Sequence, residues 1–68
     1  MKPFELRLAE QHARNARHVK NLSSFCADKS RFMRLDPVDQ TLLLEQLEHM
    51  SALDEILTKR MKRLNIPV

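Results

Sequence analysis

The segment Asp36-Pro37-Val38-Asp39 marks the start of a helix, and it constrains the fold more than any other part of the chain. Asp36 is a good N-cap, because its carboxylate can accept a hydrogen bond from a free amide of the first turn. Proline is favoured at the first helical position, where its missing N–H costs nothing. Asp39 adds negative charge where the helix dipole favours it. The chain therefore divides into a helical segment before residue 36 and one long helix after it.

Apolar residues of the second helix follow two neighbouring stripes. The first stripe has the four- and three-residue spacing of a packing seam and consists of Leu43, Leu47, Met50, Leu57, Met61 and Leu64, with Asp54 as a polar interruption. The second stripe is formed by Leu42, Leu53 and Ile56. Two adjacent stripes make an apolar face that is too wide for one partner helix. We therefore expect a homo-oligomer with the second stripe at its interface.

The first helix carries two polar residues on its own seam. The apolar positions of that seam are Leu8, Val19, Leu22 and Cys26. The intervening positions fall at His12 and Asn15, which we expect at an interface. Three readings stay open for this pair: polar contacts that set the register of an oligomer, the lining of a small-molecule pocket, or a solvated stretch of helix that projects beyond its partner.

A short break joins the two helices. Asp28 can cap a single helical turn after it. Because the connection at 28–36 is short, helices over about 4–27 and about 37–64 should run antiparallel. The sequence predicts an all-α fold with a single domain over residues 1–68. That domain is a two-helix antiparallel hairpin with a short connecting helical turn, and it assembles as a homo-oligomeric helical bundle.

Composition excludes several classes of protein. A chain of 68 residues without glycine has no backbone-cradled phosphate loop, which argues against P-loop and dinucleotide-fold enzymes. One cysteine permits no intramolecular disulfide, and the three histidines lack the spacing of a metal site. No apolar run approaches the roughly 20 residues that cross a bilayer. We expect a cytoplasmic protein that is not an enzyme, needs no cofactor or metal and does not enter the membrane.

Charge is distributed unevenly along the chain. Residues 1–34 hold eight Lys/Arg against three Asp/Glu, a net +5, whereas residues 35–68 hold four against six, a net −2. Arg7, Arg14 and Arg17 could form a basic stripe for backbone phosphates. Nucleic acid is nevertheless a poor fit, because aromatic stacking platforms are missing. The basic half suits an anionic partner, or pairs internally with the acidic start of the second helix.

The connecting turn contains a candidate anion site at Lys29, Ser30 and Arg31. Free amides at a helix N-terminus beside Lys and Arg side chains favour a phosphate. In an oligomer, Gln46 or Arg60 of a neighbouring copy could complete this site around a phosphate-bearing ligand. The alternative is an ordinary solvated loop.

The segment from Phe25 to Met61 resembles a group of short bacteriophage and prophage helical-hairpin accessory proteins. The matching positions are Phe25, Lys29, Phe32, Leu35, Gln40, Leu42-Leu43, Gln46-Leu47, Met50, Ile56-Leu57 and Arg60-Met61. Such proteins often have an aromatic residue between the methionine and the Ile-Leu pair, where this chain has Leu53. If that aromatic residue stacks on a ligand, its replacement puts the ligand site in doubt.

The resemblance implies a non-enzymatic phage accessory protein with an anti-defence role, acting in the host cytoplasm. Small helical oligomers of phages include sponges that sequester cyclic-nucleotide immune signals. The leading hypothesis is therefore a homo-oligomer that sequesters a nucleotide-type immune signal. Two alternatives stay open: a protein–protein interaction module that binds and blocks a host defence protein, and a weak DNA-binding accessory factor.

Overall fold

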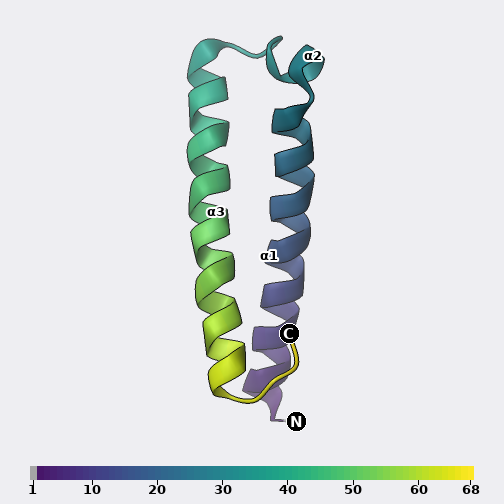
Figure 1. Cartoon of the computed structure of the whole chain (residues 1–68), viewed down its shortest axis with the longest axis vertical. Helices are drawn as coiled ribbons and strands as arrows, with labels where there is room; N and C mark the ends of the chain where they lie inside the picture. The colour runs from purple at the N-terminus through teal and green to yellow at the C-terminus, as the bar shows by residue number, and fades with distance from the viewer. Residues whose placement is uncertain (1) are drawn as a thin grey trace.

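The computed structural model describes residues 2–68 and is an antiparallel helical hairpin (Figure 1). Helix α1 spans Pro3–Ala27, the single turn α2 spans Lys29–Phe32, and helix α3 spans Pro37–Arg63. Helices α1 and α3 lie side by side along a molecule 45 Å long, with α2 at one end and both termini at the other. The all-helical class is confirmed, whereas assembly of several copies stays a prediction.

The start of α3 is stabilised by hydrogen bonds within the chain reversal. The Asp36 carboxylate accepts a hydrogen bond of 2.8 Å from the backbone N–H of Val38, and Pro37 occupies the first helical position, as predicted. Gln40 Nε2 donates to the carbonyl oxygen of Leu35 at 2.9 Å, which ties the incoming chain to the first turn of α3. These bonds fix where the chain turns back.

The end of α3 folds back onto the hairpin through a left-handed residue. Asn65 has φ 58°, and asparagine is one of the few residues other than glycine that tolerate this region. The N–H of Asn65 donates to the carbonyl of Lys62, and the N–H of Ile66 donates to that of Met61. This is the Schellman pattern, which satisfies two otherwise free helix carbonyls. It also directs the Ile66 side chain into the core.

The buried core lies at the end of the hairpin that carries the termini. It consists of Leu8, Leu57, Met61 and Ile66, with Ala9 packed against it. Leu57 is only 1% exposed. The reading in which the first half of α1 is simply solvated is therefore wrong, because Leu8 belongs to the driest part of the molecule. Toward α2, the seam residues of both helices are only half-buried.

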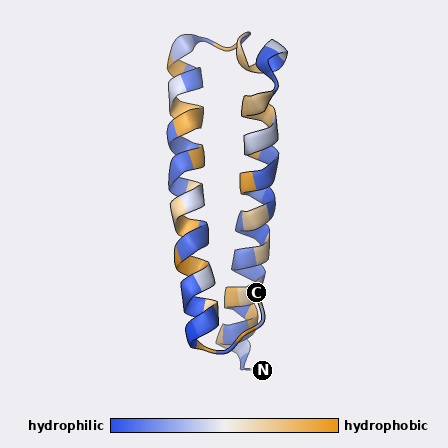
Figure 2. Cartoon of the chain, viewed as in Figure 1, coloured by the Kyte–Doolittle hydropathy of each residue, from blue (hydrophilic) through white to orange (hydrophobic). Residues whose placement is uncertain are grey.

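Apolar residues are not confined to the contact between α1 and α3. Figure 2 shows hydrophobic positions distributed along both long helices. On α3, exposed apolar side chains include Val38, Leu42, Leu53 and Ile56. A face of α3 other than the one that packs on α1 therefore presents apolar side chains to solvent.

Candidate functional site

A pocket with a volume of about 580 Å³ lies alongside α1, next to Leu53 of α3. Its lining residues are Arg7, Glu10, Gln11, Arg14, Asn15, His18 and Leu53. We call it the α1 pocket. Because helical residues three or four positions apart share a face, Arg7, Gln11, Arg14 and His18 form one continuous row. The volume is within the range of about 300–1,000 Å³ typical of small-molecule sites.

Two cationic side chains give this pocket its chemical character. Arg7 and Arg14 flank Glu10 along α1, so the two guanidinium groups outnumber the single carboxylate. Within residues 2–68, the ion pairs involve His12 with Asp54 and Arg31 with Asp28, and neither engages Arg7 or Arg14. A guanidinium without a carboxylate partner can donate two parallel hydrogen bonds to a phosphate. The pocket is therefore suited to an anion that also has an apolar portion, which Leu53 can contact.

Asn15 connects the pocket to the contact between the two long helices. Its Nδ2 donates a hydrogen bond of 3.0 Å to the backbone carbonyl of Met50, and the residue is only 8% exposed. A buried side-chain amide has to be satisfied in this way, because an unpaired polar group in the interior is costly. The bond holds α1 at one height along α3. It thereby places the row of pocket residues beside Leu53.

His12 meets the polar interruption of the α3 seam. Its Nε2 lies 3.0 Å from the Oγ1 of Thr58 and 3.7 Å from the Oδ1 of Asp54. That Asp54 oxygen is buried and has no hydrogen-bond partner within the described chain. The polar seam positions of the two helices thus face one another inside a single chain. These contacts of His12 and Asn15 do not require a second copy, so their place at an interface between copies stays a prediction.

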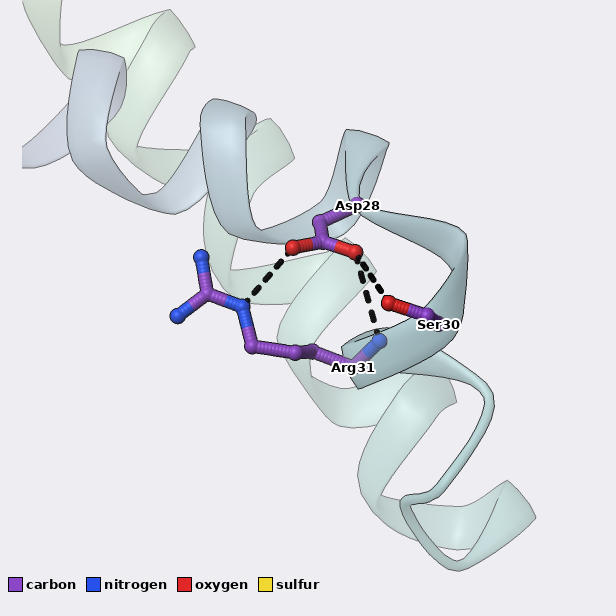
Figure 3. Close-up of polar contacts among 3 residues, drawn as sticks. All are labelled: Asp28, Ser30 and Arg31. Carbon is purple, nitrogen blue, oxygen red and sulfur yellow. Dashed lines mark hydrogen bonds and ion pairs between the residues drawn. The ribbon is translucent and has the colours of Figure 1, made fainter.

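The predicted anion corner at Lys29, Ser30 and Arg31 is organised around an internal carboxylate (Figure 3). Asp28 caps α2 and accepts hydrogen bonds from Ser30 Oγ at 2.8 Å, Arg31 Nε at 2.8 Å and the Arg31 backbone N–H at 3.4 Å. The hydrogen bonds from Ser30 and Arg31 lower the pKa of Asp28 from its ordinary value of 3.8. The Arg31 guanidinium also lies 5.4 Å from the centre of the Phe25 ring. Asp28 therefore occupies the position in which an external anion was expected.

The other predicted ligand residues lie apart from this corner within one chain. Gln46 and Arg60 are exposed on α3, and Gln46 Nε2 contacts the Sδ of Met50 at 3.7 Å. Arg60 lies near the end of α3, which is the end of the hairpin opposite α2 (Figure 1). A single copy does not bring Arg60 to Lys29, Ser30 or Arg31. Only a neighbouring copy in the opposite orientation could do so, as the prediction supposed.

The α1 pocket is not evident from the sequence, although part of its lining is. Arg7 and Arg14 were grouped with Arg17 as a stripe for nucleic-acid phosphates, and Arg17 does not line the pocket. The pocket also depends on the position of α3, which places Leu53 beside the row of α1 residues. The four- and three-residue spacing of Arg7, Gln11, Arg14 and His18 is the signal that could have indicated a shared face.

Metal-ligand clusters and membrane-spanning helices are both absent from the described residues. Residues 2–68 contain no group of three or more His, Cys, Asp or Glu side chains arranged to hold a metal ion. Neither long helix in this part of the chain has a stretch both long and apolar enough to span a bilayer.

Comparison with protein families gives one match that covers most of the chain. The family model described as Sequestin matches residues 2–63. Comparisons with curated proteins and with solved structures gave no significant match. The matched range includes all of α1, α2 and α3 and every residue of the α1 pocket.

Proposed function

The chain belongs to the Sequestin family, and we propose that it binds and sequesters a nucleotide-type signal without converting it. The family name is consistent with a binding or sequestering role. In this proposal the protein is phage-encoded, assembles as a homo-oligomer and removes an immune signal from the host cytoplasm. Such a protein acts by binding alone. Its binding site therefore has to supply affinity and selectivity for the signal, and it needs no catalytic group.

The α1 pocket supports this proposal best. It combines two guanidinium groups that form no ion pair within residues 2–68 with an apolar side chain and two side-chain amides, in a volume of about 580 Å³. A nucleotide presents the matching features, because its phosphates are anionic and its base has a flat apolar face with polar edges. Arg7 and Arg14 would bind the phosphates. Leu53 would pack against the base or sugar, and Gln11 would form a hydrogen bond with a polar edge.

The pocket takes precedence over the corner at Lys29, Ser30 and Arg31 as the phosphate site. At the corner, Asp28 already receives the hydrogen bonds of Ser30 and Arg31, and its negative charge repels an anion. Within residues 2–68, Arg7 and Arg14 form no ion pair, although the Glu10 carboxylate also lines the pocket. The proposed ligand residues are therefore those of the first helix, with Leu53 from the second long helix.

Titration calorimetry with a panel of cyclic di- and trinucleotides tests the proposal. We expect wild-type protein to bind at least one member, with affinity that falls as salt rises because the phosphate contacts are electrostatic. The double variant Arg7→Gln/Arg14→Gln should weaken binding by about 100-fold or more, since each lost charge-assisted bond is worth about 1.5–3 kcal/mol.

The single variants Arg14→Gln and Arg17→Gln provide a matched control. Each removes one charge from an exposed position of α1, but only Arg14 lines the pocket. The proposal requires Arg14→Gln to weaken binding by at least about 10-fold and Arg17→Gln to leave it nearly unchanged. Absence of heat with every nucleotide in the panel, or an equal effect of the two substitutions, would contradict it.

The exposed apolar residues Leu42, Leu53 and Ile56 favour a second candidate function, in which the protein docks on a host defence protein and blocks it. An apolar stripe of this kind is typical of an interaction surface. Binding of a purified host defence protein that persists in Arg7→Gln/Arg14→Gln and is lost in Leu42→Asp would support this candidate over nucleotide sequestration.

A further inference from the structure

We propose that two copies of this chain pack α3 against α3 in antiparallel orientation, and that each copy thereby forms part of the rim of the other's α1 pocket. The contact surface is a row of seven residues that we call the outer stripe: Val38, Leu42, Gln46, His49, Leu53, Ile56 and Arg60. This inference rests on the proposed function, which already includes self-association. It adds the contact face, the orientation of the two copies and the residues that one copy contributes to the other.

The outer stripe has the spacing of a second helix-packing seam. Its members are separated by four or three positions throughout, from Val38 to Arg60. From Leu42 onward, each member precedes a residue of the α1-facing seam by one position, as Ile56 precedes Leu57. One position is about 100° around a helix, so the two seams lie on different faces of α3. Packing against α1 therefore leaves the outer stripe uncovered.

Exposure in the single chain agrees with this geometry. Leu42 is 54% exposed and Ile56 is 53% exposed, whereas Leu57 is 1% exposed. Burying a leucine or isoleucine side chain contributes about 1.5–3 kcal/mol. A two-fold contact buries each apolar residue of the stripe in both copies. The stripe therefore offers a considerable driving force, since the core within residues 2–68 contains only four buried apolar side chains.

Charge complementarity selects a second copy as the occupant and antiparallel as its orientation. The start of α3 is acidic, with Asp36, Asp39, Glu45 and Glu48, and its end is basic, with Lys59, Arg60, Lys62 and Arg63. An antiparallel pair places the acidic start of one α3 beside the basic end of the other, twice. A parallel pair would place like charges together at both ends, which is unfavourable. The charge at each end of α3 is thus complementary to the charge at the opposite end of α3 in a second copy.

One register satisfies both the apolar and the charged positions. With Leu42 of each copy opposite Leu53 of the other, Gln46 lies opposite His49, and Asp36 lies opposite Lys59 of the second copy. Leu53 also lines the α1 pocket. Leu42 and Gln46 of the second copy would therefore reach the pocket rim beside Leu53. This arrangement gives Gln46 the role of a ligand residue contributed by a neighbouring copy, and it encloses a pocket that a single chain leaves open.

Sedimentation equilibrium on ligand-free protein tests self-association. We expect wild-type protein to have twice the mass of one chain or a multiple of that value, and Ile56→Asp to be monomeric with unchanged helical circular dichroism. Leu44→Asp is the matched control. Leu44 is also exposed, at 50%, but it lies about 200° from Leu42 on α3 and so outside the stripe. A monomeric wild type, or equal disruption by both substitutions, overturns the inference.

Disulfide cross-linking tests the orientation. In a Cys26→Ala background, oxidation of a mixture of Leu42→Cys and Leu53→Cys proteins should join unlike chains. Leu42→Cys alone should cross-link at least about 10-fold less, because residues 42 of the two copies are then about 16 Å apart along the helix axis. Efficient cross-linking of Leu42→Cys alone would indicate a parallel pair and contradict the inference. Nucleotide binding by a monomeric protein would preserve nucleotide sequestration as the function while refuting self-association and this assembly.

Discussion

The two ends of the hairpin are stabilised by different interactions. At the end with the termini, Leu8, Leu57, Met61 and Ile66 form a dry apolar core. At the end with α2, none of the described residues is buried, and hydrogen bonds of Asp28, Asp36 and Gln40 hold the chain reversal. Local polar bonds can therefore determine where a chain turns, while the burial that stabilises the fold is concentrated about 30 Å away along the same pair of helices.

The α1 pocket is adjacent to the well-packed half of the molecule. Its residues Arg7 to His18 lie on the part of α1 that contains Leu8 and Asn15, both of which are buried. A ligand site benefits from such a position, because side chains on a rigid element are already oriented before the ligand arrives. The corner at α2 lacks this support, in addition to carrying an internal carboxylate.

The largest expected effect is that of Leu57→Ala at the packed end. Leu57 is the most deeply buried side chain of the core, and such truncations cost about 2–5 kcal/mol. Leu47→Ala is the matched control, since it makes the same change at a half-buried seam position closer to α2. Urea denaturation should show a clearly larger loss for Leu57→Ala. Equal losses would mean that burial does not distinguish the two ends.

A smaller effect is expected for Asn15→Ala, which removes the hydrogen bond between the side chain and Met50. Loss of this bond should lower the free energy of unfolding by about 1–1.5 kcal/mol. It should also weaken nucleotide binding, because α1 would no longer be held at one height beside Leu53. The control Asn21→Ala changes an exposed asparagine of the same helix. Equal effects of the two substitutions on stability and on nucleotide binding would show that the Asn15 hydrogen bond contributes to neither.

The smallest expected effect is the pH dependence contributed by Asp28. Because hydrogen bonds from Ser30 and Arg31 lower the pKa of this carboxyl in the folded chain, its stabilising contribution is present above pH 3.8 and is lost as the pH falls below that value. Asp28→Asn should remove this part of the acid sensitivity while retaining a capping oxygen. Thermal unfolding of both proteins between about pH 2.5 and pH 6 measures the difference. Parallel curves across the whole range would show that Asp28 does not contribute.

The helices were predictable from the sequence because their signals are local. Asp36 and Pro37 occupy the cap and first position of α3, and Asp28 caps α2, as their side-chain chemistry requires. The spacing of Leu57 and Met61 indicated the seam that is buried against α1. Each of these inferences needs only neighbours within one helix.

Features that depend on the register between the helices could not be predicted in this way. The meeting of His12 with Asp54 and Thr58 depends on the height at which two antiparallel helices pack, and many registers satisfy the apolar pattern. Proline at position 67 is unfavourable for further helix, but it does not indicate that Asn65 adopts a left-handed conformation and returns Ile66 to the core. The α1 pocket depends on the same register through Leu53.

Mapping the ligand contact by nuclear magnetic resonance tests the central claim most directly. Backbone amide shifts of isotope-labelled wild-type protein would be followed during titration with each cyclic nucleotide of the panel. We predict that the largest changes for a binding nucleotide lie within residues 7–18 and at Leu53. Changes confined to residues 28–31, or the absence of changes with every nucleotide, would contradict the assignment of the α1 pocket as the binding site.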